Sequence, residues 1–257
     1  MIGKILASGQ LGKLASFVTP AFFDVMPARA LWSRARKLLA GTRDHEAFRH
    51  AVAERSATLA KVLPEVQLQD STPTAARTTS AAPAGGNEAR AARVIELFFH
   101  QLFYGRITLL DLRAQSFYPD GERLLWHPAS WLAEFTPDFI GPLRDIYRGF
   151  YTRDDARFRQ GLQALSLQSC EDLFRKHFGG DQTLVSFRTV DFVDTFHQVF
   201  QRCKQQGVAL HPDFLPLGIY LAALYDHLED LAVAVDVSAA FDRATRATLP
   251  DPEALHA

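Results

Sequence analysis

The sequence predicts a mainly helical protein, and three observations lead to that fold class. The chain has 257 residues, of which 47% are hydrophobic, so it is able to bury a sizeable core. Apolar side chains recur at helical spacing in several segments, most cleanly over Thr189–Gln206, where they fill an arc of roughly 120°. Strand-like segments are short and lie around one turn, Pro119-Asp120-Gly121.

Composition divides the chain into four parts. Residues 70–87 consist largely of Ser, Thr, Pro, Ala and Gly, which bury too little apolar surface to offset the entropy of ordering. This part is therefore predicted to be a flexible linker. A basic helical N-terminal region precedes it, a helical domain follows it, and a tail ends the chain. The predicted bounds are 1–69, 70–87, 88–248 and 249–257.

The first eighteen residues have a pattern typical of a helix at a membrane surface. Lysines are spaced among apolar side chains there, and the predicted membrane-contact residues are Lys4, Ile5, Leu6, Lys13 and Phe17. Glycines weaken this helix, and its two apolar stripes do not share one face. Docking of the segment onto the protein's own core or onto a partner therefore stays open.

Two further helices are predicted in the N-terminal region. Pro27 marks a break, and an Arg-rich helix follows it to about Leu39. The second helix covers residues 43–63, because Thr42 is able to cap it and Pro64 stops it.

The helical domain is predicted to begin with a central helix over residues 89–104, whose apolar side chains cover much of its circumference. Residues 107–112 form a strand or a buried turn, and a short β-hairpin follows around Pro119-Asp120-Gly121. Thr136 caps the next helix, with Pro137 in its first turn. The later helices are expected at 137–151, 154–165, 169–178, 189–206 and 214–230.

The order of several landmarks resembles one known family. They are the hairpin, Thr136-Pro137-Asp138, Arg153-Asp154, Cys170-Glu171, and His211-Pro212 before an apolar helix. Over residues 93–241 this order is similar to the large lobe of the UbiB/AarF atypical protein-kinase-like family. The resemblance implies a helical domain like that lobe, with a short β-hairpin and a helical N-terminal extension. It also implies an association with ubiquinone biosynthesis or membrane-lipid metabolism.

The catalytic motifs of that family are missing from this chain. Phosphoryl transfer needs a phosphate cradle, a lysine and Mg²⁺ ligands, and no glycine-rich phosphate loop occurs. In the family's catalytic loop, Asp111 is the one candidate for the acid and Gln115 for the amide, and the spacing fits one of them at a time. His127 stands where a metal-binding Asp is expected, although Mg²⁺ prefers oxygen ligands. We therefore expect no catalytic residue beyond these weak candidates, no metal site, and no ATP or Mg²⁺ cofactor.

Trp126, His127 and Trp131 bracket the position of the missing metal site. Under one interpretation, apolar packing has filled a vacated nucleotide pocket. Under the other, the pocket is adapted to a hydrophobic ligand such as a quinone or a lipid. These three residues are the candidate ligand-pocket residues.

Charge is unevenly distributed, although the whole chain carries a net charge of -1. The first 43 residues hold seven Lys and Arg against one acid, about +6, which leaves about -7 for the rest. Without an overall basic excess, no nucleic-acid partner is expected. Two cysteines cannot build a disulfide framework, and no apolar run is long enough to span a bilayer. The sequence thus predicts a cytoplasmic protein, either free or peripheral on the inner face of the membrane.

These features predict a non-catalytic, pseudokinase-like binding or accessory protein. Its expected target is a protein partner, a lipid or quinone ligand, or a membrane surface. Two alternatives stay open. One is an enzyme with residual or repurposed ATP-dependent activity at Asp111, and the other is a helical protein-interaction scaffold.

Overall fold

The computed structural model describes residues 20–69 and 86–246. Most of these residues are helical, which confirms the predicted mainly-α fold class. The chain forms two compact units. Among the described residues, unit one draws on 20–39, 135–182 and 188–226, and unit two draws on 40–69, 86–134, 183–187 and 227–246.

Unit one is built from helices, several of which begin or end within two residues of the predicted bounds. In chain order they are α2 (Pro20–Val25), α3 (Ala28–Gly41), α6 (Pro137–Tyr151), α7 (Asp155–Ala164), the 3-10 helix η3 (Gln168–Cys170), α8 (Glu171–His177), α9 (Thr189–Gln206) and α10 (Phe214–Leu231). The last residues of α3 and of α10 belong to unit two.

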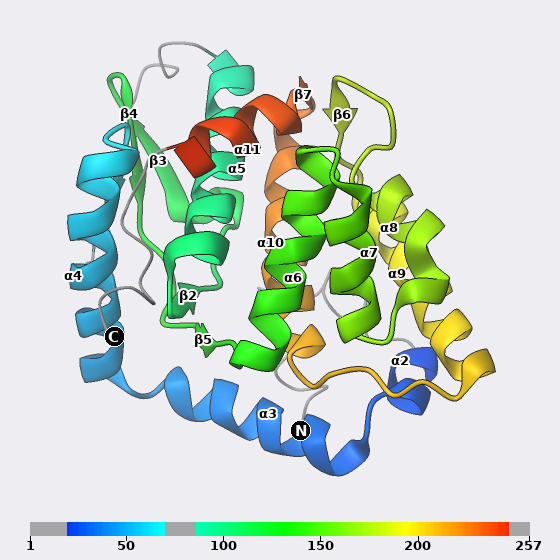
Figure 1. Cartoon of the computed structure of the whole chain (residues 1–257). Coiled ribbons are helices and arrows are strands. Elements are labelled where there is room, and N and C mark those ends of the chain that lie inside the picture. Colours follow the sequence, from blue (N-terminus) through cyan, green and yellow to red (C-terminus); the bar gives the residue numbers. More distant parts are fainter. Residues whose placement is uncertain (1–19, 70–85, 247–257) are drawn as a thin grey trace, which may run out of the picture. The chain divides into compact units, whose positions relative to one another are not determined.

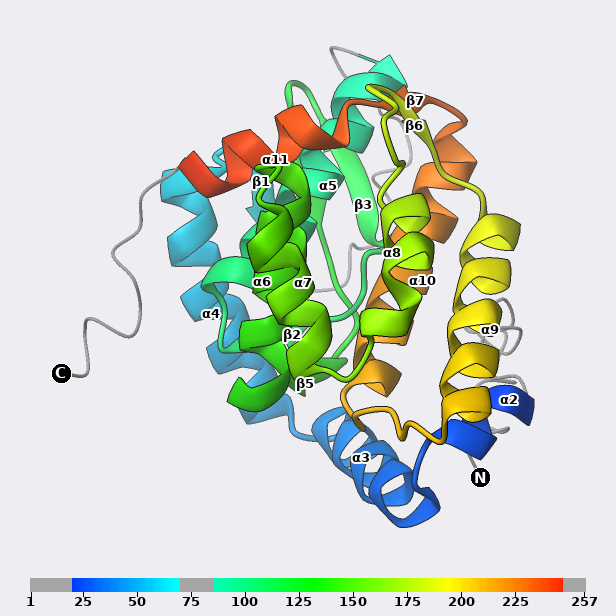
Figure 2. The ribbon, with the colours of Figure 1, turned by 45° about the vertical axis from the view of Figure 1, so that its right-hand side comes forward.

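Helix α9 has the bounds that its apolar spacing predicts. Its buried side chains include Phe192, Phe196, Val199, Phe200 and Cys203. Gly207 ends the helix in the left-handed conformation, with φ of 65°. Helix α2 packs against α9, where the rings of Phe22 and Phe200 meet edge to face with centroids 5.4 Å apart (Figure 2). The one-sided pattern in the sequence is therefore explained by burial of a single face.

Helices α6 and α7 lie side by side at very short range (Figure 1). A Cβ atom on Gly149 of α6 would lie 2.3 Å from the backbone nitrogen of Phe158, and one on Gly161 of α7 would lie 2.6 Å from the carbonyl oxygen of Pro142. The two backbones are thus able to approach because neither glycine carries a side chain.

The start of α6 differs in one detail from the prediction. Thr136 is the N-cap residue, but its side chain makes no capping hydrogen bond. Its backbone N–H and its hydroxyl donate instead to Oδ2 of Asp213, at 2.8 and 3.0 Å. Nε of Arg34 lies 2.6 Å from Oδ1 of the same carboxylate. Asp213 is buried, and a buried carboxylate needs hydrogen-bond donors and a counter-charge. It therefore accepts the Thr136 hydroxyl that would otherwise cap the helix, and it links α3 to the first turn of α6.

Unit two combines helices with small sheets. Its helices are α4 (His45–Val62), α5 (Gly86–Tyr104), the 3-10 helix η2 (Ala114–Ser116) and α11 (Val237–Arg246). Its strands are β1 (Val66–Leu68), β2 (Ile107–Leu109), β3 (Phe117–Asp120), β4 (Arg123–Trp126), β5 (Leu132–Glu134), β6 (Val185–Ser186) and β7 (Ala234–Val235). The strand orders are β1-β4-β3, β2-β5 and β6-β7.

The predicted hairpin is confirmed as the antiparallel pair β3 and β4, with Asp120 opposite Arg123. Gly121, with φ of 62°, occupies the first position of the two-residue turn, where a positive φ suits the twist of the strands. The sequence analysis missed β1, which pairs in parallel with β4 and places Val66 opposite Leu124. Strand β1 belongs to the predicted N-terminal region and β4 to the predicted helical domain, so these parts share one sheet.

Helix α5 is buried along most of its length, as its apolar circumference predicts. Helix α11 crosses it in both ribbon views (Figures 1 and 2). The ring of Phe241 meets those of Phe99 and Phe103, with centroids 5.1 and 5.6 Å away. The Tyr104 hydroxyl donates to the carbonyl oxygen of Thr245 at 3.1 Å, so the end of α5 is also fixed by a polar contact.

The cap of α4 corrects another detail. Asp44 precedes the helix, and its carboxylate accepts a hydrogen bond from the backbone N–H of Ala47 at 2.9 Å. The sequence analysis assigned this role to Thr42. Asp44 is the better cap because its negative charge also faces the positive end of the helix dipole.

Candidate functional site

Asp111, the weak candidate for a catalytic acid, is buried just after β2 and its carboxylate is fully engaged. Arg113 donates from Nε to Oδ1 at 2.7 Å and from a terminal nitrogen to Oδ2 at 2.9 Å. The Ser116 hydroxyl and the Ala129 backbone N–H also donate to Oδ2, at 2.7 and 2.8 Å. The carboxylate therefore stands at the centre of a buried polar cluster made by its own chain.

Electrostatics keep Asp111 charged inside unit two. Burial by itself would raise the pKa of this carboxyl. The hydrogen bonds and charge of Arg113, together with the bonds from Ala129 and Ser116, outweigh burial and hold the pKa below its ordinary value. A general base works best with a pKa near the working pH, so this environment suits a structural ion pair better than proton transfer.

The predicted pocket residues lie around this cluster, with their rings against protein atoms. Trp126 is fully buried, stacks on Phe117 with a centroid distance of 5.8 Å, and donates its indole N–H to the Asp111 carbonyl oxygen at 2.8 Å. Trp131 is half-buried under the Arg113 guanidinium, 5.0 Å from the ring centroid. His127, also half-buried, lies beside Tyr118.

Gln115, the other weak catalytic candidate, is exposed, and no hydrogen bond of its side chain is found among the described residues. It follows Ala114 in η2, whose carbonyl oxygen accepts a hydrogen bond from Arg90 at 3.2 Å. The structure thus joins Trp126 to Asp111 directly and Trp131 to Asp111 through Arg113, and it leaves the Gln115 side chain exposed.

The polar cluster extends to a residue pair that the sequence analysis did not connect with Asp111. Nδ1 of His227 lies 2.9 Å from the carbonyl oxygen of Leu112, and Arg90 donates from Nε to Nε2 of His227 at 3.2 Å. This arrangement assigns the proton to Nδ1.

Two buried histidines of unit two predict a loss of stability in acid. Burial lowers the pKa of His100 to about 4 and that of His227 to about 3, whereas an unfolded histidine titrates near 6.5. As the pH falls below about 6.5, the unfolded chain binds protons that the folded chain does not, so each histidine lowers the free energy of unfolding by about 1.4 kcal/mol per pH unit. The lost stability returns as the pH rises again, and it is fully restored above about pH 6.5.

Urea unfolding at a series of pH values between about 7 and 4 measures this slope. His100→Leu is the informative variant, because neither ring nitrogen of His100 has a hydrogen-bond partner among the described residues. We expect the variant to lose about 1.4 kcal/mol per pH unit of the wild-type slope. An unchanged slope would mean that His100 titrates normally in the folded protein.

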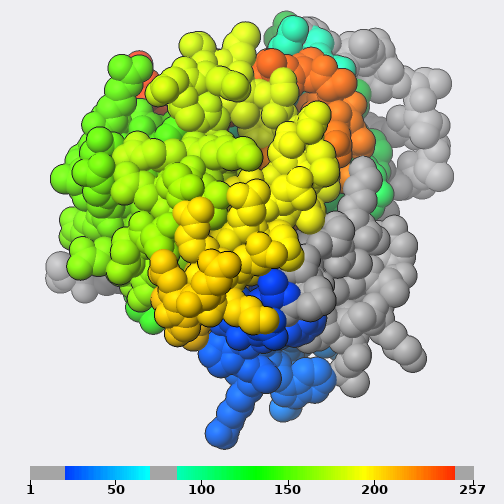
Figure 3. Space-filling view, turned by 90° about the vertical axis from the view of Figure 1, so that its right-hand side faces the viewer, coloured from blue at the N-terminus to red at the C-terminus, as the bar shows by residue number. Residues whose placement is uncertain are grey.

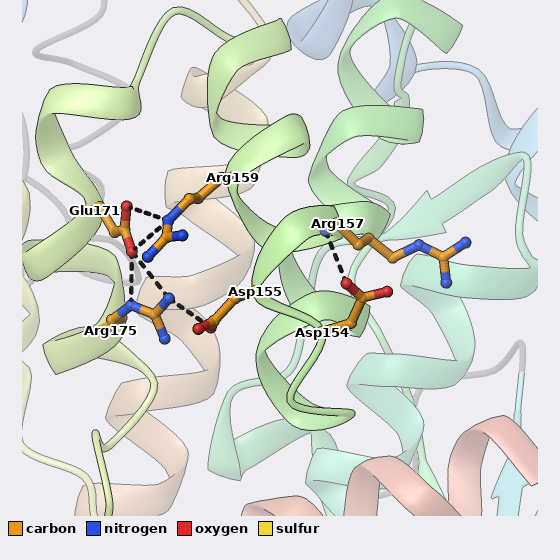
Figure 4. A network of polar contacts seen from close by, with 6 residues as sticks. All are labelled: Asp154, Asp155, Arg157, Arg159, Glu171 and Arg175. Atoms are coloured by element: carbon orange, nitrogen blue, oxygen red, sulfur yellow. Dashed lines mark hydrogen bonds and ion pairs between the residues drawn. The ribbon is translucent and has the colours of Figure 1, made fainter.

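A network of ion pairs joins α7 and α8 at the surface of unit one (Figure 4). Glu171 accepts hydrogen bonds from Arg159 at 3.2 Å and from Arg175 at 2.9 Å, and Arg175 also reaches Asp155 at 2.7 Å. Asp154 separately caps α7 through the Arg157 backbone N–H at 3.0 Å. Because these charges neutralise one another at the surface, the network braces two helices and offers little net charge to a ligand.

The outer face of α3 differs, because its charges are unpaired. This face comprises Arg29, Trp32, Ser33, Arg36 and Lys37, which are all exposed and span an arc of roughly 140° at 100° per residue. Trp32 is 44% exposed. The three cations make no hydrogen bond or ion pair with any residue of the described chain. Three positive charges thus share this face of the helix with an exposed indole.

The opposite side of α3 is anchored in unit one. Leu31 and Ala35 are buried, and Arg34 pairs with Asp213. The one acid of α2 and α3, Asp24, is paired with Lys204 of α9 at 2.7 Å, so neither helix supplies a charge to offset the outer face. Figure 3 shows these two helices in blue at the lower edge of the surface, against the end of α9.

The remaining site predictions concern residues beyond this description or other kinds of site. The predicted membrane-contact residues Lys4, Ile5, Leu6, Lys13 and Phe17 lie outside the described residues. Within residues 20–69 and 86–246, no group of three or more His, Cys, Asp or Glu is placed to hold a metal ion. In the same ranges, no helix combines the length and the apolar character needed to cross a bilayer.

Comparison with known proteins does not add a family to these observations. No protein-family model matches the chain, and no curated protein matches it. The contacts and charges described above are therefore the basis for the functional proposal.

Proposed function

We propose that this protein is a non-catalytic binding protein that attaches peripherally to an anionic membrane surface through the outer face of α3. The observation that carries the proposal is that Arg29, Arg36 and Lys37 share one exposed face of α3 with Trp32, and that α3 contributes no acidic residue to that face. The protein then acts on lipid or quinone metabolism as an accessory factor, in keeping with the resemblance to the UbiB/AarF family.

The chemistry of the outer face of α3 fits anionic headgroups. A Lys or Arg near such a surface contributes about 1 kcal/mol of attraction, so three of them give about 3 kcal/mol. An exposed tryptophan suits the headgroup level because its ring is apolar and its N–H finds a hydrogen-bond acceptor there. The long Arg and Lys stems allow the charged groups to spread over the lipid while the helix stays on the protein.

The state of Asp111 favours binding over phosphoryl transfer. A catalytic aspartate has to accept a hydrogen bond from the attacking group, whereas Arg113, Ser116 and Ala129 already occupy both oxygens of this carboxylate. Trp126 and Trp131 are likewise held by protein groups. The unpaired charges of α3 are thus the better candidate for a functional surface.

Co-sedimentation with vesicles tests the proposal. The full chain is mixed with vesicles of phosphatidylcholine alone or with added phosphatidylglycerol, at low and at raised salt. We expect binding that requires the anionic lipid and weakens with salt, and we expect Arg29→Ala/Arg36→Ala/Lys37→Ala to lower the partition coefficient by roughly 100-fold. Trp32→Ala should weaken binding further at every salt concentration.

A matched control distinguishes the effect of the outer face of α3 from the effect of the protein's net charge. Arg49, Lys61 and Arg123 are exposed cations of unit two for which no ion pair is found in the described chain, and replacing all three with alanine changes the net charge equally. This variant should bind nearly as the wild type does. If both triple variants lose the same amount of vesicle binding, the net charge of the protein explains the binding and the outer face of α3 does not. If the α3 variant binds as the wild type does, the proposal is refuted.

A further inference from the structure

The two cysteines of the chain, far apart in sequence, are brought close together within unit one. Cys170 ends η3 and Cys203 lies on α9, and these two elements pack against each other, so that each thiol perturbs the pKa of the other. Their side chains are 0% and 1% exposed. Figure 2 shows α8, which directly follows Cys170, beside α9. The fold has therefore paired the only two sulfhydryl groups of the protein.

A polar clamp holds the two segments together next to the thiols. Arg202, the residue before Cys203, donates to the carbonyl oxygen of Ser169, the residue before Cys170, at 2.7 Å. Arg202 also forms an ion pair with Asp172. The Ser169 hydroxyl lies 3.8 Å from Sγ of Cys170. The backbones that carry the thiols are thus fixed to each other by bonds that do not involve sulfur.

The surroundings shift the pKa values of the two thiols in opposite directions. The hydrogen bond from Cys203 lowers the pKa of Cys170 to about 7, against the effect of burial and with help from Ser169 and the Arg202 charge. The same hydrogen bond, together with burial, raises the pKa of Cys203. A thiolate is the nucleophilic form of cysteine, so Cys170 is the attacking group and Cys203 the partner that resolves the product.

We propose that Cys170 and Cys203 form an oxidation site that hydrogen peroxide converts into a disulfide, a property independent of membrane attachment. The Cys170 thiolate attacks one peroxide oxygen, the O–O bond breaks, and the departing hydroxide takes up a proton to form water. Cys203 sulfur then attacks the Cys170 sulfenic acid; the S–S bond forms, the S–O bond breaks, and the Cys203 proton leaves with the hydroxide as a second water. Two thiols and one peroxide thus yield one disulfide and two waters.

Burial selects the oxidant. Hydrogen peroxide is small and uncharged, whereas glutathione disulfide is too bulky and charged to reach thiols that are shielded from solvent. The disulfide would join η3 to α9. It would lower the conformational entropy of the unfolded chain between the two cysteines. We therefore expect the oxidised protein to melt roughly 5 °C or more above the reduced protein.

The experiment treats the folded, full-length chain with peroxide or with glutathione disulfide, then denatures it and labels free thiols with a maleimide. With peroxide, both thiols should resist labelling, the intact mass should fall by two hydrogen atoms, and a reductant should restore both. Glutathione disulfide should leave both thiols labelled. Two reactive thiols after peroxide, or a mass gain of oxygen without a disulfide, would overturn the proposal.

Three variants test the roles of Cys170, Cys203 and Arg202, and a fourth variant is the control. Cys203→Ser should retain a Cys170 sulfenic acid that a dimedone-type reagent traps, while Cys170→Ser should react several-fold more slowly and yield no such adduct. Arg202→Gln should slow disulfide formation several-fold, because it removes the clamp and the nearby charge. Arg159→Gln changes an arginine of the same unit that does not touch either thiol, and it should oxidise at the wild-type rate. Equal oxidation rates in Cys170→Ser and Cys203→Ser would contradict the assigned order.

Discussion

Replacing Asp111 with alanine should lower the free energy of unfolding by about 3–5 kcal/mol, the range observed when one partner of a buried ion pair is removed. The side chains of Asp111 and Arg113 are 1% and 9% exposed, so the variant leaves the guanidinium charge buried without its carboxylate. Ser116 and the Ala129 N–H lose their acceptor at the same time. Chemical denaturation monitored by circular dichroism measures the loss.

The controls for this prediction use the same unit. Asp242 pairs with Arg246 on α11, where the two side chains are 45% and 79% exposed, so Asp242→Ala should change stability by less than about 0.5 kcal/mol. The double variant Asp111→Ala/Arg113→Ala should be less destabilised than the sum of the single variants. If Asp111→Ala unfolds like the wild type, the carboxylate is dispensable for folding, and the catalytic interpretation of Asp111 regains support.

Gly149→Ala should destabilise the protein by about 2–3 kcal/mol, although alanine normally favours a helix. The added Cβ would lie 2.3 and 2.6 Å from the backbone N and Cα of Phe158, and a backbone atom cannot rotate away as a side chain does. Helices α6 and α7 would have to separate, which opens gaps along their whole contact. Thermal and urea unfolding measure the loss.

Gly141 provides a control within the same helix. Apart from its chain neighbours and the nearby backbone of α6, no atom lies within 4 Å of a Cβ added there. Helix propensity favours alanine, whereas the following Pro142 disfavours a Cβ at this position, so Gly141→Ala should leave stability within about 1 kcal/mol of the wild type. Gly161→Ala, whose Cβ would lie 2.6 Å from the Pro142 carbonyl oxygen, should behave like Gly149→Ala. Stabilisation by both Gly141→Ala and Gly149→Ala would show that α6 and α7 do not require this close approach.

The same helix pair marks a limit of sequence reasoning. Residue spacing predicted both helices, because an apolar face repeats locally every three or four residues. It did not reveal that Gly149 and Gly161 lie at a helix crossing, since a glycine in a helix reads only as a weak helix former. The close approach depends on two backbones that are separated along the chain.

The candidate sites also contain features that the sequence indicated and features that it did not. The sequence singled out Asp111 as a weak catalytic candidate and Trp126 and Trp131 as candidate pocket residues. In the structure, Trp126 donates to the Asp111 carbonyl oxygen and Trp131 lies under Arg113. Arg113 was not considered, although it follows Asp111 by two residues and pairs with it. The two cysteines were interpreted as too few for a disulfide framework. The packing of η3 against α9, which brings them close together, joins segments that no local pattern connects.

By itself, the sequence determined the helical fold class, the bounds of α9, and the hairpin of β3 and β4, because periodicity, a helix-ending glycine and turn residues act over a few neighbouring positions. Only the tertiary structure decided that β1 pairs with β4 and that Asp111 forms a buried ion pair with Arg113. It also decided that Arg34 has an ion-pair partner, whereas none is found among the described residues for Arg29, Arg36 and Lys37. Strand pairing and ion pairing depend on which distant groups meet and lose water together, and one-dimensional spacing does not contain that information.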